Sequence, residues 1–255
     1  MPKQTSPAWI KNWARALLQP VPLIGLLRVP DYFMEWSRYA TLAGKRPALA
    51  DSYPCLMDKV LSTPFDPHYF FQGAWLARKV ARSMPAQHVD VSSSVMTIAA
   101  LSGFVNTVFV DYRPLQVALP NLDCRAGNIT QLPFESASVE SLSCLHVIEH
   151  IGLGRYGDPL DAHGSESAAK ELQRIVRPGG SLYLSTPVGR ERVCFNAHRV
   201  FAPATIVALF DRMELVAFSH VDDGGNLVDN STLQAAGENE YACGLFHFRK
   251  RGDAL

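Results

Sequence analysis

The chain has 255 residues, of which 47% are hydrophobic and 19% charged, a balance typical of a globular protein. Its 24 basic and 24 acidic residues cancel, which argues against a nucleic-acid-binding protein, because that class needs clustered positive charge. Five cysteines without a C-x-x-C spacing predict a reduced, cytoplasmic protein that has neither a disulfide framework nor a zinc knuckle.

The first quarter of the chain differs in composition from the rest. Nine of the 17 prolines lie in the first 67 residues, so we predict a helical, proline-rich arm over residues 1–68. Trp9, Trp13 and Leu17 recur at a spacing of four, which predicts an amphipathic helix. Its apolar face fits two partners, the protein's own main domain or, as a peripheral contact, the inner membrane surface. The apolar stretches are too short to span a bilayer.

Helical and strand patterns alternate in the remaining domain, residues 69–255. A helix is predicted over 69–83, and further helices over 95–104, 165–176 and 203–210. Strands are predicted over 87–92, 106–112, 141–148, 181–187, 213–221 and 241–250. This alternation predicts an α/β fold with a doubly wound, mostly parallel sheet and helices on both faces.

The carboxyl ends of such strands border the ligand crevice, so the residues that follow each strand are candidate site residues. Asp111 ends the strand predicted over 106–112. A carboxylate there can accept two hydrogen bonds from ribose hydroxyls. The alternative is an acid that complements the dipole of a following helix. The sequence leaves both open.

Two longer stretches resemble a known family. "GNITQLPFESASVESLSCLHVIEH" (127–150), then a predicted helix, then "RPGGSLYLSTP" (177–187) is similar to the class I S-adenosylmethionine-dependent methyltransferases over residues 86–250. "HVIEHIGLGRYGDPLD" (146–161) and "FNAHRVF" (195–201) resemble a branch of unknown function in bacteria and nematodes, associated with surface polysaccharide synthesis. The resemblance implies a Rossmann-like, seven-stranded sheet and S-adenosylmethionine as cofactor.

The resemblance also implies which residues contact the cofactor. The loop after the first strand would meet the methionine part, Asp111 the ribose, and the segment before the fourth strand the adenine. The implied contacts are Asp90, Ser92, Ser93, Asp111, Asn128, Ile129 and His146. Serines replace the family's glycines in the first loop, where a left-handed backbone costs a serine more. A non-catalytic methyltransferase-like binding protein in a glycan assembly complex is therefore the alternative to an enzyme.

A glycine-rich loop, residues 151–164, follows the predicted fourth strand. Its three glycines, Gly152, Gly154 and Gly157, permit tight turns. We expect its polar side chains and those of "FNAHR" to bind the methyl acceptor, namely Arg155, Tyr156, Asp158, Asn196 and Arg199. Paired arginines suit a phosphate or carboxylate, so the expected acceptor is small or glycan-linked and anionic.

His198 and His150 are the candidate general bases, because imidazole titrates near neutral pH. Each also has a structural explanation, His150 as a cap of the strand end and His198 as a hydrogen-bond partner of the loop. We expect no metal, because the possible ligands lack a tight spacing such as H-E-x-x-H. These ligands are His146, His150, Asp158, Asp161, His163 and His198.

Overall fold

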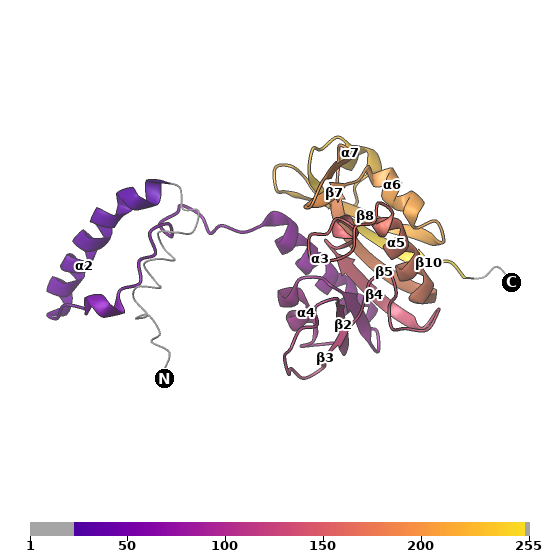
Figure 1. Cartoon of the computed structure of the whole chain (residues 1–255), viewed down its shortest axis with the longest axis horizontal. Helices are drawn as coiled ribbons and strands as arrows, with labels where there is room; N and C mark the ends of the chain where they lie inside the picture. The colour runs from indigo at the N-terminus through magenta and orange to yellow at the C-terminus, as the bar shows by residue number, and fades with distance from the viewer. Residues whose placement is uncertain (1–22, 253–255) are drawn as a thin grey trace. The chain divides into compact units, whose positions relative to one another are not determined.

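The computed structural model describes residues 23–252, and the chain divides into two units, Met1–Phe65 and Asp66–Leu255 (Figure 1). The helix predicted around Trp9 and Trp13 lies outside the described residues. The second unit opens with α3 (Pro67–Ser83), whose N-cap Asp66 accepts a hydrogen bond from the Tyr69 amide at 3.2 Å. Proline at the first helical position and an aspartate cap together fix where this helix begins.

The described part of the first unit is mostly helical. It comprises the short helix η1 (Leu23–Arg28), α2 (Val29–Ala43) and the short helix η2 (Leu49–Asp51). The C-cap of α2 is Gly44, whose φ of 65° is the left-handed conformation that ends helices. The Arg28 guanidinium donates to the Leu56 oxygen at 3.2 Å. No helix within residues 23–252 has the length and hydrophobicity that a membrane crossing requires.

One eight-stranded sheet organises the second unit, in the order β3-β2-β1-β4-β5-β10-β8-β9. The first five strands in that order are parallel, and β10 runs antiparallel between β5 and β8. The strands are β1 (His88–Val91), β2 (Thr107–Asp111), β3 (Leu122–Ala126), β4 (Val139–Leu145), β5 (Val176–Val188), β8 (Met213–Val221), β9 (Leu227–Val228) and β10 (Ala242–Lys250). The predicted doubly wound, mostly parallel sheet is confirmed.

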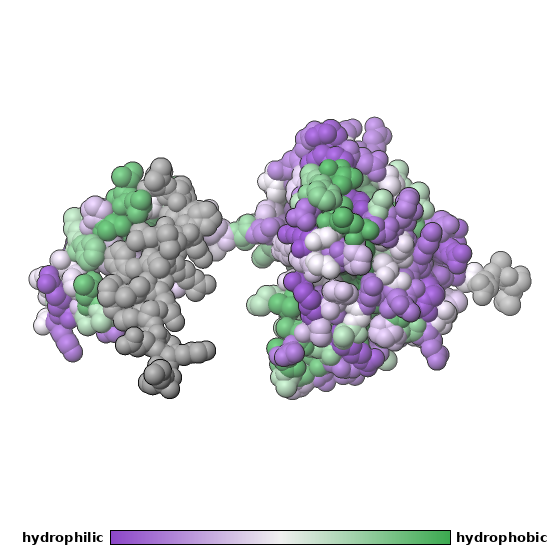
Figure 2. Space-filling view, viewed as in Figure 1, coloured by the Kyte–Doolittle hydropathy of each residue, from purple (hydrophilic) through white to green (hydrophobic). Residues whose placement is uncertain are grey.

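Helices cover both faces of this sheet, as predicted (Figure 1). On one face α3 and α4 (Val95–Leu101) bury Trp75, Leu76 and Ile98. On the other face α5 (Gly164–Ile175) and α6 (Pro203–Leu209) pack. Ala168, Leu172 and Ile175 of α5 are fully buried and lie on one face of the helix. The face of this unit that Figure 2 shows is largely polar, with several apolar patches.

Four details differ from the predicted elements, the first being that β3 (Leu122–Ala126) lies in none of the predicted strand ranges. The sheet has eight strands instead of seven, because Leu227–Val228 adds the two-residue edge strand β9. β5 begins at Val176, directly after α5, and includes the predicted helix stop "RPGG". A hairpin of β6 (Arg192–Cys194) and β7 (His198–Val200), the short helix η3 (Ile148–His150) and α7 (Leu233–Gly237) complete the unit. These short elements carry too few residues to show a periodic pattern.

Candidate functional site

A cavity of about 260 Å³ lies at the carboxyl ends of β1, β2, β3 and β4. This is the edge at which parallel α/β sheets bind ligands. Eight of the predicted site residues line it, namely Ser92, Asp111, Asn128, Ile129, His146, His150, Tyr156 and Asp158. The other six predicted residues do not line it: Asp90, Ser93, Arg155, Asn196, His198 and Arg199.

The loop after β1 turns tightly although it contains serines in place of glycines. Ser92 adopts a φ of 58°, the left-handed conformation, and its amide donates to the Val110 oxygen at 2.9 Å. Ser93 accepts a hydrogen bond from the Leu145 amide at 2.9 Å through its hydroxyl. Its own amide donates to Asp90 at 3.0 Å. Ser93 therefore holds the loop against β4 and Ser92 holds it against β2, and of the loop serines Ser92 lines the cavity.

Asp90 lies beneath this loop and is fully buried. Its carboxylate accepts hydrogen bonds from the Ser93 amide and from the Ser143 hydroxyl. Burial raises the pKa of Asp90 to about 6, although these hydrogen bonds act in the opposite direction. Asp90 thus positions the loop from below.

The loops after β2 and β3 form the opposite wall of the cavity. Asp111 ends β2, and its carboxylate accepts the Arg113 amide at 2.7 Å. Asn128 accepts the Thr130 amide at 3.0 Å, while the neighbouring Ile129 is 6% exposed. This wall offers a carboxylate, an amide and an apolar surface side by side. Arg113, which sequence reasoning did not assign to the site, places its guanidinium 4.8 Å from the centre of the Tyr156 ring.

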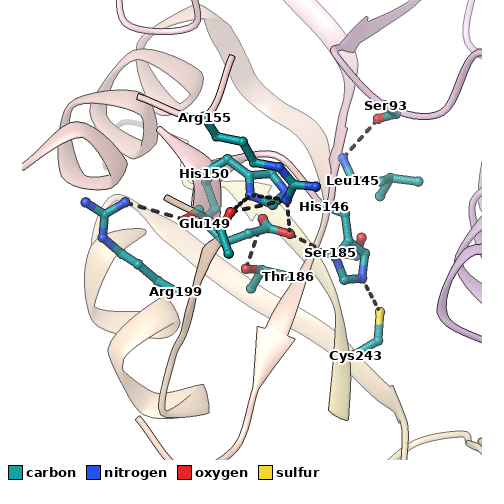
Figure 3. Close-up of polar contacts among 12 residues, drawn as sticks. Ser93, Leu145, His146, Glu149, His150, Arg155, Ser185, Thr186, Arg199 and Cys243 are labelled. Carbon is teal, nitrogen blue, oxygen red and sulfur yellow. Dashed lines mark hydrogen bonds and ion pairs between the residues drawn. The ribbon is translucent and has the colours of Figure 1, made fainter. Parts of the chain in front are cut away.

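Glu149 is a buried carboxylate in η3, just after β4, and was also missed (Figure 3). Its Oε1 lies 2.8 Å from His146 Nδ1, and Thr186 donates to Oε2 at 3.3 Å. Burial alone would raise the pKa of Glu149, but His146 and then His150 lower it overall. Burial likewise opposes the charge on His146, yet contacts with Cys243 and Glu149 raise the pKa of His146 well above its usual range. Both shifts favour the ionised forms of the pair.

His150 stands in the cavity wall beside Glu149. Its Nδ1 is 2.6 Å from the Ala197 oxygen. A carbonyl only accepts, so Nδ1 carries the proton and Nε2 is the basic nitrogen of the neutral ring. That nitrogen lies 3.7 Å from Glu149 Oε1. Burial lowers the pKa of His150, which favours the neutral ring.

His198 sits behind His150, with ring centres 6.5 Å apart, and packs on Tyr241 at 5.1 Å. Burial, and then the charge of His150, lower the pKa of His198. The two predicted bases are therefore neighbours, but His150 lines the cavity and His198 does not.

The glycine-rich loop takes the tight turns that its sequence predicted. Gly152, Gly154 and Gly157 have φ values of 80°, 69° and 84°. A Cβ atom on Gly152 would lie 2.0 Å from the Asp161 oxygen, so only glycine fits there. Asp158 accepts the Gly152 amide at 2.8 Å and the Tyr156 amide at 3.2 Å. Asp158 therefore closes the loop on itself at the cavity wall.

The "FNAHR" segment holds this loop from behind. Arg199 is 9% exposed and donates to the backbone oxygens of Ile151, Asp161 and Ala162. The Asn196 amide reaches the Leu153 oxygen at 3.5 Å. Arg155 donates to the Ala197 oxygen at 3.2 Å and lies 5.1 Å from the Tyr156 ring centre. These contacts fix the conformation of the loop. Tyr156 is the large side chain by which the loop lines the cavity.

Comparison with known proteins agrees with this geometry. Residues 75–184 match a family model described as a methyltransferase domain. Residues 134–250 match one described as Caenorhabditis protein of unknown function, DUF268. An uncharacterized methyltransferase of Schizosaccharomyces pombe is 29% identical over 94 residues, 37% of this chain and 31% of that protein. A probable S-adenosylmethionine-dependent methyltransferase of Mycolicibacterium smegmatis is 32% identical over 80 residues, 31% of this chain and 26% of that protein.

The aligned chain thus spans less than a third of either curated relative. Among solved structures, the YcgJ protein of Bacillus subtilis superimposes with a TM-score of 0.51 at 12% identity, covering 72% of this chain and 99% of that one. A putative methyltransferase of Haloferax volcanii, solved with its methyltransferase activator, also gives 0.51, at 17% identity, covering 74% and 92%. The structural matches show that this chain shares its fold with these proteins, and the match to a methyltransferase domain covers residues 75–184.

Proposed function

We propose that this protein transfers the methyl group of S-adenosylmethionine to a nucleophilic atom of a small or glycan-linked acceptor. One observation carries the proposal. A single cavity joins a wall suited to a nucleoside, with Asp111, Asn128 and Ile129, to a wall that holds the base His150. Methyl transfer needs this juxtaposition, because the acceptor must approach the sulfonium in line with the bond that breaks.

The residues of the first wall fit the cofactor. The Asp111 carboxylate is of the type that binds ribose hydroxyls, and the apolar surface of Ile129 suits the face of an adenine. The left-handed turn at Ser92 gives the loop the backbone shape for which relatives use glycine. When bound, S-adenosylmethionine supplies an electrophilic methyl group.

On the second wall, His150 is the proposed general base. Its Nε2 accepts the proton of the acceptor, while Nδ1 keeps its hydrogen bond to the Ala197 oxygen. Glu149, 3.7 Å from Nε2, stabilises the imidazolium that forms. Ile151 and Val147 line the same cavity and limit the access of water to the reacting atoms. His198 is the second candidate base; it packs behind the ring of His150 and does not line the cavity.

The proposed acceptor carries a phosphate or carboxylate. Two guanidinium groups, those of Arg113 and Arg155, approach the ring of Tyr156, and Arg113 and Tyr156 line the cavity. Guanidinium binds such anions bidentately, so a nucleotide-linked sugar or phosphorylated glycan suits this rim. A role in surface polysaccharide synthesis would follow from such an acceptor.

Calorimetric titration with S-adenosylmethionine and S-adenosylhomocysteine tests the proposal. We expect micromolar affinity for the demethylated product, about −8 kcal/mol. Purified protein with methyl-labelled cofactor should then label nucleotide-linked sugars above a no-protein control. Absence of both heat and thermal stabilisation at millimolar ligand would favour a non-catalytic binding protein in a glycan assembly complex.

A further inference from the structure

Three side chains from separate elements converge beside the proposed acceptor wall. His68 lies at the start of α3, His146 follows β4, and Cys243 is on β10. One nitrogen or sulfur atom from each lies within 4.8 Å of those of the other two. His146 Nε2 and Cys243 Sγ are 3.2 Å apart. We propose that His68, His146 and Cys243 bind a zinc ion.

The ligand set selects the type of metal. Two imidazoles and a thiolate are the donors that Zn²⁺ uses, whereas Mg²⁺ and Ca²⁺ require oxygen ligands. Zinc bonds of about 2.0–2.3 Å in a tetrahedral site separate neighbouring ligand atoms by roughly 3.3–3.8 Å. The pair formed by His146 and Cys243 is already close to that spacing. His68 completes the set with a small inward movement, which its half-exposed position at a helix start permits.

Glu149 supplies the outer-shell contact that zinc-binding histidines need (Figure 3). Its carboxylate lies 2.8 Å from His146 Nδ1, which leaves Nε2 directed at Cys243. Metal-bound histidines almost always donate their second ring nitrogen in this way. One thiolate and one buried carboxylate also balance the two charges of Zn²⁺, so the ion costs little to bury.

The backbone of His146 supports the same assignment. Its φ is 55°, a left-handed conformation that costs a non-glycine residue free energy. Its ring stacks with those of His68 and Tyr69, with ring centres 5.5 and 5.6 Å away. Such strain persists where the surrounding structure fixes a side chain for a task. Here that task is the alignment of His146 with Cys243.

A buried donor is linked to this cluster through Ser185. Gln72, one helical turn after His68, accepts a hydrogen bond from the Ser185 hydroxyl. The Ser185 backbone oxygen in turn accepts the His146 amide at 2.9 Å. Among the described residues, Nε2 of Gln72 has no hydrogen-bond partner and is fully buried. An oxygen ligand on the zinc ion would give this donor an acceptor.

Three protein ligands leave a fourth position on zinc, as in catalytic zinc sites. Of the three ligands, His146 lines the cavity, so in this proposal that position is reached from the acceptor wall. There zinc would bind the oxygen of an acceptor hydroxyl or the sulfur of an acceptor thiol. The ion would lower the pKa of that group before methyl transfer. This role, unlike the binding of the ion, rests on the proposed function.

The test titrates Zn²⁺ into metal-free, untagged protein without S-adenosylmethionine. We expect one bound ion per chain. His68→Gln and Cys243→Ala should each lose more affinity than Glu149→Gln, whose outer-shell loss is about 10–100-fold. His163→Gln and Cys124→Ser are the controls and should match the wild type, because His163 pairs with exposed Glu166 and Cys124 lies on the edge strand β3. Bound Co²⁺ should show a thiolate charge-transfer band that Cys243→Ala abolishes.

Equal Zn²⁺ affinity in the wild type, His68→Gln and Cys243→Ala, or no binding at one ion per chain, would overturn the proposal. Cys243→Ala is checked by circular dichroism, because Cys243 is buried in the sheet. His68→Gln keeps the test decisive, since His68 lies at a helix start outside the sheet. Separate titration with S-adenosylhomocysteine distinguishes the outcomes: cofactor binding without zinc rejects only this inference, and zinc binding without cofactor rejects only the proposed function.

Discussion

Arg199 Nη1 donates to the Ile151 oxygen at 2.7 Å and to the Ser165 hydroxyl at 3.1 Å, so one guanidinium on β7 joins both ends of the glycine-rich loop. Its Nη2 adds contacts of 3.4 Å to the Asp161 and Ala162 oxygens. Sequence reasoning predicted that Arg199 binds the acceptor. Its 9% exposure and its position outside the cavity lining point instead to a role in shaping the loop.

Arg199→Ala should destabilise the fold by about 3 kcal/mol, because charge-assisted hydrogen bonds to several buried oxygens are lost together. Urea unfolding measures the change. Arg125→Ala is the matched control: its ion pair with Asp123 is exposed, so it should cost less than about 1 kcal/mol. If both substitutions cost the same, Arg199 does not hold the loop.

Asp111→Asn should weaken the binding of S-adenosylhomocysteine about 10- to 100-fold, because a charge-assisted bond contributes roughly 1.5–3 kcal/mol. Asparagine keeps the oxygen that accepts the Arg113 amide, so the loop should stay intact. Calorimetry gives the affinity. Asp123→Asn on the edge strand β3 serves as control and should bind like the wild type. An unchanged affinity in Asp111→Asn would remove Asp111 from the cofactor site.

Ser92→Gly should stabilise the protein by up to about 1 kcal/mol and leave the affinity for S-adenosylhomocysteine unchanged, because glycine adopts a φ of 58° without strain. Ser94→Gly is the matched control. Ser94 is the N-cap of α4 with a φ of −60°, so glycine relieves nothing there. Thermal unfolding compares the two. Equal shifts in melting temperature would mean that the left-handed turn costs the protein little.

The predictable parts of this structure were those that local patterns encode. The apolar strand patterns predicted the sheet, and the helical spacing of apolar residues predicted the helices that cover it. The rule that ligands bind at strand ends predicted that Asp111 and His150 lie in one site. The edge strand β3 was not predicted, because it has only five residues and three of them are exposed. His68 and Cys243 are 175 positions apart, so only the folded chain brings them together. The burial of Glu149 could not be predicted from the sequence either, because a glutamate beside a histidine near a strand end usually lies in solvent.

Once an acceptor supports turnover, His150→Gln should lower kcat by roughly 10²–10⁴-fold, the usual range for a general base. His198→Gln should have a smaller effect, because His198 does not line the cavity. Affinity for S-adenosylhomocysteine, measured on the same samples, should change little in either variant. The reverse order, with His198→Gln as the more damaging change, would assign the base to His198.

Asp90 makes the stability of the fold depend on pH. Its carboxyl group is buried against Ser143, which also lies 2.8 Å from Nε2 of buried His88. Burial raises the pKa of Asp90 from 3.8 to about 6 in the folded state, so folding favours the protonated form. That contribution is complete below pH 4 and is lost as the pH rises through 6. A difference of two pKa units corresponds to about 3 kcal/mol.

Asp90→Asn should remove this dependence, because the amide stays neutral at every pH and can still accept the Ser93 amide and contact Ser143. Between pH 4 and pH 7 the wild type should therefore lose about 3 kcal/mol of unfolding free energy relative to the variant. His88, whose pKa burial lowers to about 3, is present in both proteins, so its own titration cancels in the comparison. Asp211→Asn, at an exposed position after α6, should instead follow the wild type. Chemical unfolding at matched ionic strength across this range measures all three proteins. A constant difference between the wild type and Asp90→Asn would show that Asp90 is ionised in the fold throughout and that its hydrogen bonds outweigh its burial.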